Sequence, residues 1–238
     1  MFRILRAGLA PATLLLLAGC LKVGREANSQ RLNFNLTDST IAADWSVAAA
    51  DFPTARLADV GLVGDWRPLP SEVSTTLSGL YMSGTNVTGD LFVFLKKRLI
   101  GLPPGQRYSV AIQLEYVSNV HSGCTTGLGT SVWIKAGVSA LEPIAEPDAQ
   151  DFYRMNLDKG IQSAAGSYTQ LGDIRNGLSG CPSPGTFAAR TTNRLDQSAT
   201  MTTDSEGGFW IFLGTQSAVL ARHELYITAV QVTLFAVF

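Results

Sequence analysis

The sequence predicts an all-β protein, an antiparallel two-sheet sandwich for which a jelly roll of the galactose-binding-like type is the expected topology. Strand-length segments follow one another through residues 31–238, and turns rich in Gly, Pro, Ser and Asn separate them. Several segments alternate apolar and polar residues with the period of two that half-buried strands show. No long amphipathic helix lies between them. We therefore expect one β-sandwich domain over residues 31–238.

The strongest strand pattern lies in residues 90–118, where a Pro-Gly turn separates two apolar segments. Residues 90–99 are apolar on both faces, and residues 107–118 place Tyr108 and alternate apolar residues on one face. We expect the two segments to form the middle of an antiparallel sheet. The run from Leu102 to Tyr108 also resembles the tyrosine corner of two-sheet proteins, which implies a hydroxyl bonded to upstream backbone.

The other strands are shorter and their ends are less sharply marked. Residues 48–72 contain scattered Pro and Gly, which indicates loops and short strands only, and residues 147–159 allow one or two helical turns. Further strands are expected at 32–36, 45–47, 77–83, 131–138, 167–174, 190–202, 208–214 and 225–235.

The first 19 residues have the layout of a secretory signal peptide. Arg3 and Arg6 precede an apolar run too short for a permanent membrane span, and small residues follow it. Leu17-Ala18-Gly19-Cys20 resembles the lipobox of bacterial lipoproteins. The resemblance implies cleavage before Cys20 and lipidation of that cysteine with acyl chains of the palmitate type. The alternative is a plain secretory signal in which Cys20 has no special role.

The lipobox resemblance has consequences for location. Several acyl chains on Cys20 would hold the protein stably in a membrane, whereas one chain binds only marginally. Residues 20–30 are polar and aperiodic, so they form a tether that keeps the domain near the bilayer. Leu21 after the cysteine implies the outer membrane if the source is Gram-negative. We expect a lipid-anchored protein of the cell envelope.

The charge of the chain argues against nucleic-acid binding. The formal net charge is −1, and removal of Arg3 and Arg6 with the leader makes it −3. The main basic run, Lys96-Lys97-Arg98, is expected to be the solvated end of a strand. We therefore expect no nucleic-acid partner.

Cysteine usage agrees with export. Besides Cys20 the chain has only Cys124 and Cys181, each in a loop rich in Gly and Ser. An even pair in an oxidising compartment predicts a Cys124–Cys181 disulfide. The rival interpretation, a metal-binding or nucleophilic thiol, lacks the neighbouring His or Cys spacing that it needs.

The sequence does not indicate a catalytic site. His121 and His223, far apart in the chain, belong to no ligand motif and are read as ordinary loop or strand-end residues. Paired carboxylates could serve glycoside hydrolysis, but the sequence does not select two of them at the required separation. The candidates are Asp90, Glu115, Asp158 and Glu224. Enzyme activity is therefore the less favoured interpretation.

No organic cofactor is indicated, but a structural calcium ion remains open. Asp and Asn oxygens in loops are ligands that calcium accepts, although no EF-hand spacing is present. The alternative is that these residues form turns through their side chains. The candidates are Asp38, Asn86, Asp90 and Asp204.

Two tryptophans are candidates for ligand binding. Trp133 alternates with Val132 and Ile134 on a predicted strand and would face outward, free to stack on the apolar face of a sugar. Trp66, in a loop, is the second candidate, whereas Trp45 and Trp210 are expected in the core. The alternative for Trp133 is packing beneath a loop.

Short runs of the mature part resemble a family of uncharacterised secreted bacterial β-sandwich proteins, which implies an exported β domain and no mechanism. They are residues 67–70, 83–86, 90–92, 101–104, 131–137, 156–160 and 208–211. The functional prediction is a lipid-anchored module that binds a ligand of the glycan type. The alternative is a structural or assembly lipoprotein that binds another envelope protein.

Overall fold

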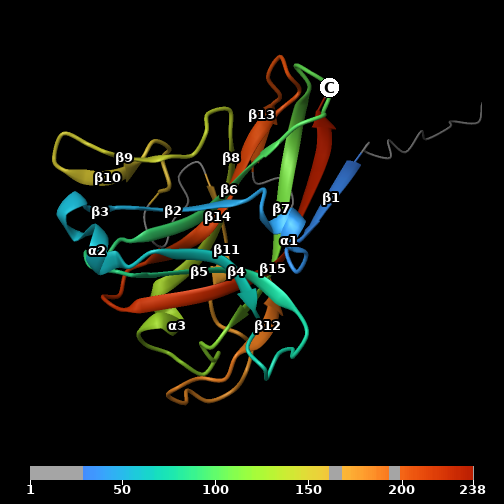
Figure 1. Ribbon diagram of the computed structural model, residues 1–238. Helices are drawn as coiled ribbons and strands as arrows, with labels where there is room; N and C mark the ends of the chain where they lie inside the picture. Colours follow the sequence, from blue (N-terminus) through green and yellow to red (C-terminus); the bar gives the residue numbers. More distant parts are fainter. Residues whose placement is uncertain (1–28, 161–167, 193–198, 238) are drawn as a thin grey trace, which may run out of the picture.

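The computed structural model describes residues 29–160, 168–192 and 199–237, and it confirms the predicted all-β fold. Two antiparallel sheets pack face to face, and a small third sheet projects from one side (Figure 1). This is a two-layer sandwich of the jelly-roll class.

Sheet A has seven strands within the described residues. Five of its strands follow the order β12-β7-β15-β5-β4. Of the other two, β1 pairs with the second half of β15, and β13 pairs with the first half of β7. In chain order the strands are β1 (Ser29–Asn35), β4 (Val63–Pro68), β5 (Ser78–Thr85), β7 (Arg107–Ser118), β12 (Ala188–Thr191), β13 (Ala199–Thr202) and β15 (Arg222–Val237).

Sheet B forms the opposite layer, in the order β11-β8-β14-β6-β2, and sheet C has the order β3-β10-β9. The strands of sheet B are β2 (Ser46–Ala50), β6 (Phe92–Leu99), β8 (Val132–Ser139), β11 (Tyr168–Asp173) and β14 (Phe209–Ser217). Those of sheet C are β3 (Phe52–Pro53), β9 (Ala145–Pro147) and β10 (Phe152–Met155). The described helices are short: α1 (Ser39–Ala42), η1 (Thr54–Arg56), α2 (Leu57–Val60) and α3 (Leu128–Ser131).

The expectation that residues 90–118 form neighbouring strands of one sheet is wrong. β6 belongs to sheet B and β7 to sheet A, so the turn between them carries the chain across the sandwich. Tyr108 is buried at the start of β7, but its hydroxyl makes no hydrogen bond to another described residue. The inter-sheet crossing is therefore present without the tyrosine-corner hydrogen bond that the resemblance implied.

Three other segments differ from the sequence prediction. Residues 147–159 contain β10 rather than helical turns, and β10 pairs with β9 and β3. Residues 190–202 contain parts of two strands, β12 and β13, which pair with different parts of β7. The last strand, β15, is the longest and pairs with β1, β5 and β7. Such pairing partners, distant in sequence, are not visible in a periodic pattern.

The core lies between the two sheets. Val93 and Leu95 of β6 face Leu114 of β7 and other alternate residues of sheet A within one buried cluster. Trp45 belongs to this cluster, as expected. His223 lies among these residues at 3% exposure, and its Nε2 is 2.9 Å from Thr215 Oγ1. It lies at one end of β15, as predicted, but it is buried between the sheets.

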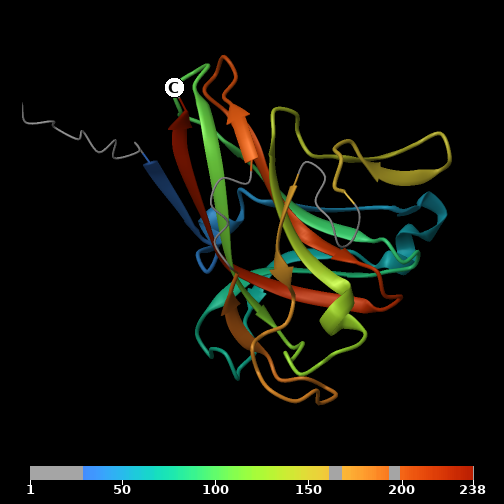
Figure 2. The same cartoon turned by 180° about the vertical axis from the view of Figure 1, so that it is seen from behind.

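The start of β1 lies at the same end of the sandwich as the end of β15, because Ser29 pairs with Phe235 (Figure 2). Among the described residues, no helix has the length and apolar character needed to cross a membrane. The predicted signal peptide, Cys20 and most of the tether lie outside the described residues.

Candidate functional site

The outer face of sheet B carries a tryptophan at each end. Cross-strand pairing places Trp133 of β8 beside Gln216 of β14, and Ser139 of β8 beside Trp210 of β14. Trp133 and Ser139 are six residues apart on one strand, so the two ends are about 20 Å apart. The positions between them that face outward are Phe92, Phe94, Lys96, Arg98, Lys135, Gly137, Phe212 and Gly214.

The middle of this face is covered by residues 145–160, which we call the covering segment. Met155 packs on the Phe92 and Phe94 cluster and accepts a hydrogen bond on its Sδ from the Tyr168 hydroxyl at 3.0 Å. The ring of Tyr168 stands edge-on to Phe212, with 4.6 Å between ring centroids. The face is therefore packed rather than open along its centre.

Gly137 makes room for this aromatic layer. A Cβ atom there would lie 2.5 Å from Phe212 Cζ and 2.7 Å from Tyr168 Cδ1, closer than real Cβ contacts. The absence of a side chain at residue 137 thus lets the two rings meet over β8.

A buried ionic cluster fixes the covering segment to the sheet. Lys159 Nζ lies 3.0 Å from Asp51 Oδ2 and 3.0 Å from Asp90 Oδ1. Lys135 Nζ donates to the Lys159 carbonyl oxygen at 3.0 Å, and Gln216 Nε2 donates to Asp90 Oδ1 at 2.7 Å. Burial, and next the charge of Lys159, lowers the pKa of Lys135 to about 8. Asp90 is thus already bound by an internal cation.

Trp133 lies on the outer face of β8, as expected, but much of that face is covered rather than open to solvent. Lys135, on the same face as Trp133, is fully buried, and Trp133 itself is half-buried. The covering segment, which follows β8 in the chain, folds back over Lys135. Trp66 is 41% exposed on the edge strand β4, and its indole N–H donates to the Leu36 carbonyl at 3.0 Å.

The four calcium candidates serve turns, caps and ion pairs. Asp38 caps α1 by accepting from Thr40 N at 2.8 Å, and Asn86 Oδ1 accepts from Gly89 N at 2.8 Å. Asp204 accepts from Gly208 N at 2.9 Å. Asp90 precedes β6 and Asp204 pairs with Arg98 near its far end, so β6 separates them. Within the described ranges, no three His, Cys, Asp or Glu side chains form a potential metal site.

The carboxylates considered for hydrolysis are also dispersed. Glu224 Oε2 on sheet A accepts from the Tyr81 hydroxyl at 2.7 Å, and Glu115 is exposed on β7. Asp90 and Asp158 lie near the buried ionic cluster of sheet B. Two of the four candidates thus lie on sheet A and two lie beside sheet B.

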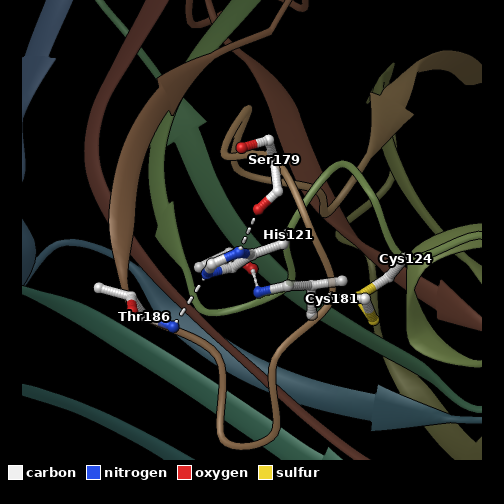
Figure 3. Close-up of a disulfide and its surroundings, with 7 residues drawn as sticks. His121, Cys124, Ser179, Cys181 and Thr186 are labelled. Carbon is white, nitrogen blue, oxygen red and sulfur yellow. Dashed lines mark hydrogen bonds between the residues drawn. A yellow bond between two sulfur atoms is a disulfide. The ribbon is translucent and has the colours of Figure 1, made fainter.

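The predicted disulfide is confirmed. Cys124 and Cys181 are bonded and join the loop after β7 to the loop before β12 (Figure 3). His121 ties the same loops, because Thr186 N donates to its Nε2 at 3.0 Å and its Nδ1 lies 3.0 Å from the Ser179 carbonyl oxygen. Nε2 accepts from the Thr186 N–H, which leaves Nδ1 to donate to the Ser179 carbonyl oxygen, so the histidine links the two loops. The prediction that it is an ordinary loop residue holds for its position, but the residue is buried.

A groove opens at the free edge of β6, and we call it the β6 groove. β2 pairs with β6 only as far as Ser46 opposite Lys96, so residues 97–99 of β6 have one strand neighbour among the described elements. The groove has a volume of about 540 Å³. Its lining consists of Leu32, Phe34, Asp44, Ser46, Lys96, Lys97, Arg98, Leu99, Ile100 and Trp210. Its volume lies within the range of small-molecule binding sites.

The β6 groove combines an aromatic side chain with charged side chains. Trp210 is half-buried on the outer face of sheet B, and Lys96 Nζ lies 5.7 Å from the centroid of its ring. Lys97 Nζ lies 5.6 Å from the ring centroid of Phe34. The prediction that Trp210 is a core residue is therefore wrong, because alternation along β14 turns it away from the inter-sheet core.

Each basic side chain of the groove is paired with a carboxylate. Lys96 binds Glu142 at 2.6 Å and Lys97 binds Asp44 at 2.9 Å. The guanidinium of Arg98 binds both Asp204 at 2.8 Å and Glu206 at 2.7 Å. The basic triplet is thus neutralised and held in place rather than free in solvent.

Comparison with protein-family models and with curated proteins found no match. Among solved structures, the fold is similar to the CBM22-1 xylan-binding domain from Paenibacillus barcinonensis Xyn10C, at 11% identity and a TM-score of 0.40, over 87% of this chain and 95% of that domain. A structure of carbohydrate-binding modules from the β-sandwich superfamily matches at 14% identity and a TM-score of 0.39, over 86% of this chain and 61% of the other.

The enzymatically active domain of bacteriophage CBA120 tailspike protein 4 matches at 7% identity and a TM-score of 0.34, over 79% of this chain. This chain spans only 19% of the tailspike structure. At such identities and TM-scores these likenesses do not bear on the ligand. The resemblance to an uncharacterised secreted family stays a prediction.

Proposed function

We propose that this protein is a lipid-anchored cell-envelope module that binds glycans in the β6 groove. The observation that carries the proposal is the groove itself, in which the half-buried ring of Trp210 lies beside oriented charged side chains. Sugars present apolar faces that stack on aromatic rings and hydroxyl groups that both donate and accept hydrogen bonds. The groove supplies both kinds of partner.

Replacing Trp210 by Ala is expected to weaken glycan binding by about tenfold, equivalent to about 1.4 kcal/mol, because the stacking face is lost. The measurement is a glycan array with the full chain in detergent, followed by titration calorimetry with the glycans retained. Trp66→Ala is the matched control, since Trp66 is exposed outside the groove and should leave affinity unchanged.

Trp133→Ala distinguishes the two ends of sheet B. If it abolishes binding while Trp210→Ala does not, the β6 groove is not the site and the sequence-based choice of Trp133 is favoured. If no glycan is retained, but an envelope protein is captured by crosslinking in cells, the protein belongs to the assembly class instead.

The anchor is tested separately. Wild-type chain expressed in a bacterial host is expected to incorporate labelled palmitate and to fractionate with membranes, whereas Cys20→Ser should do neither. Cys124→Ser is the matched control, because it removes a different cysteine. Mass spectrometry that found an unmodified Cys20 thiol at the mature terminus would contradict lipidation.

A further inference from the structure

The cations that line the β6 groove are paired with carboxylates that are more exposed. The three cations lie low, with side chains of Lys96 and Lys97 only 13% and 14% exposed and that of Arg98 35% exposed. Their four carboxylate partners are more exposed, with side-chain exposures between 40% and 74%. Asp44 lines the groove, and the other three lie beside it through these ion pairs. A ligand approaching from solvent therefore meets carboxylates first. The carboxylates paired with Lys96, Lys97 and Arg98 are Glu142, Asp44, Asp204 and Glu206.

The local charge is negative although the sequence run is basic. Three cations and four carboxylates give this cluster a formal charge of −1. An anionic ligand must either displace a carboxylate from its cation or lie beside the outer carboxylates, and both are unfavourable. A neutral hydroxyl group meets neither obstacle.

Paired charges also suit neighbouring hydroxyl groups. An ammonium or guanidinium group can only donate hydrogen bonds, and an ionised carboxylate can only accept them. Two adjacent hydroxyl groups of a pyranose can accept from the cation and donate to its partner, without breaking the ion pair. Because each ion pair is already formed, little side-chain ordering remains for binding.

We infer that the β6 groove takes neutral glycans with vicinal hydroxyl groups and discriminates against glycans that carry carboxylate groups. This rests on the proposed function, because it names the ligand class of the same groove. The discrimination is electrostatic and acts at a partly exposed site, so salt should reduce it.

The test uses matched probes: β-1,4-linked hexasaccharides of glucose, mannose and galactose, and the same hexasaccharides after oxidation of their C6 hydroxyls to carboxylates. Calorimetry with the full chain is expected to give about fivefold weaker binding of an oxidised probe than of its neutral parent at 20 mM salt. At 500 mM salt the difference should shrink, while affinity for the neutral probe stays constant.

A charge-removing variant makes the test specific to the groove. Glu142→Gln frees Lys96 from its partner and should bring the oxidised probe to within twofold of the neutral one. Glu115→Gln changes the net charge equally on sheet A, outside the groove, and should leave the fivefold difference intact.

The outcomes separate the two proposals. An oxidised probe that binds as tightly as its parent, or more tightly, overturns the inference and leaves glycan binding standing. A Glu142→Gln result equal to that of Glu115→Gln also overturns it, because the carboxylates paired with the groove cations would then have no effect on binding. Failure of every neutral and oxidised probe to bind overturns the proposed function, and the inference with it.

Discussion

Removing the Cys124–Cys181 disulfide is expected to lower the free energy of unfolding by about 4 kcal/mol. The bond closes a loop with a sequence separation of 57 residues, and the chain-entropy model assigns that much stabilisation to restriction of the unfolded chain. The measurement is urea unfolding of the Cys124→Ala/Cys181→Ala double variant against wild type.

The folded sheets should survive this loss. His121 and Asn176 continue to tie the loops, the latter by donating to the Ser118 and Thr186 carbonyls at 2.8 Å and 2.9 Å. Circular dichroism at low urea should therefore stay that of a β protein. As a control, a reducing agent should destabilise the wild type and leave the double variant unchanged. A change below 1 kcal/mol would show that the bond contributes little.

Acidification from pH 7.5 to pH 4.5 is expected to remove about 2.5 kcal/mol of stability through His223 alone. Burial between the sheets lowers the pKa of His223 from 6.5 to about 4. The unfolded state therefore binds a proton more readily than the folded state in this range. The stability is fully present above pH 6.5 and is lost as the pH falls toward 4.

The matched variant is His223→Gln, which retains a polar side chain beside Thr215 but does not titrate. Urea unfolding at several pH values should show a flatter profile for the variant than for wild type between pH 7.5 and pH 4.5. A hydrogen bond from the Thr40 hydroxyl, and next one from the Thr40 backbone N–H, lowers the pKa of Asp38 from 3.8. Backbone N–H groups of Phe152 and Gly208 lower the pKa values of Asp148 and Asp204 in the same direction. Their contributions are lost at lower pH, so they do not obscure the comparison. Parallel profiles would contradict the role of His223.

Much of the fold follows from local pattern. Alternation in residues 107–118 and 225–235 identifies β7 and β15, and the two-sided apolar character of residues 90–99 reflects β6, which is covered on both faces. The disulfide could be predicted as well. Once Cys20 is assigned to lipidation, the chain has only two other cysteines, and an oxidising compartment favours their pairing. These features depend on neighbouring residues or on residue counts, which a sequence displays directly.

The candidate site was predicted less well. Trp210 reads as core because β14 is apolar on both faces, and only its pairing with Ser139 and Arg98 shows that it borders the β6 groove. Trp133 reads as exposed because no local periodic pattern shows that residues 145–160 fold back over β8. The charged run at residues 96–98 gave a correct location at a strand end, but not its four carboxylate partners.

The sequence by itself determined the secondary structure class, the half-buried strands and the disulfide pairing, and the exported location stays a prediction. The tertiary structure decided that β6 and β7 lie in different sheets, that Lys135 is buried, and that the edge of β6 is left open beside Trp210. The physical reason is that periodicity reports which side of a strand is apolar, whereas the occupant of each side comes from segments far away along the chain.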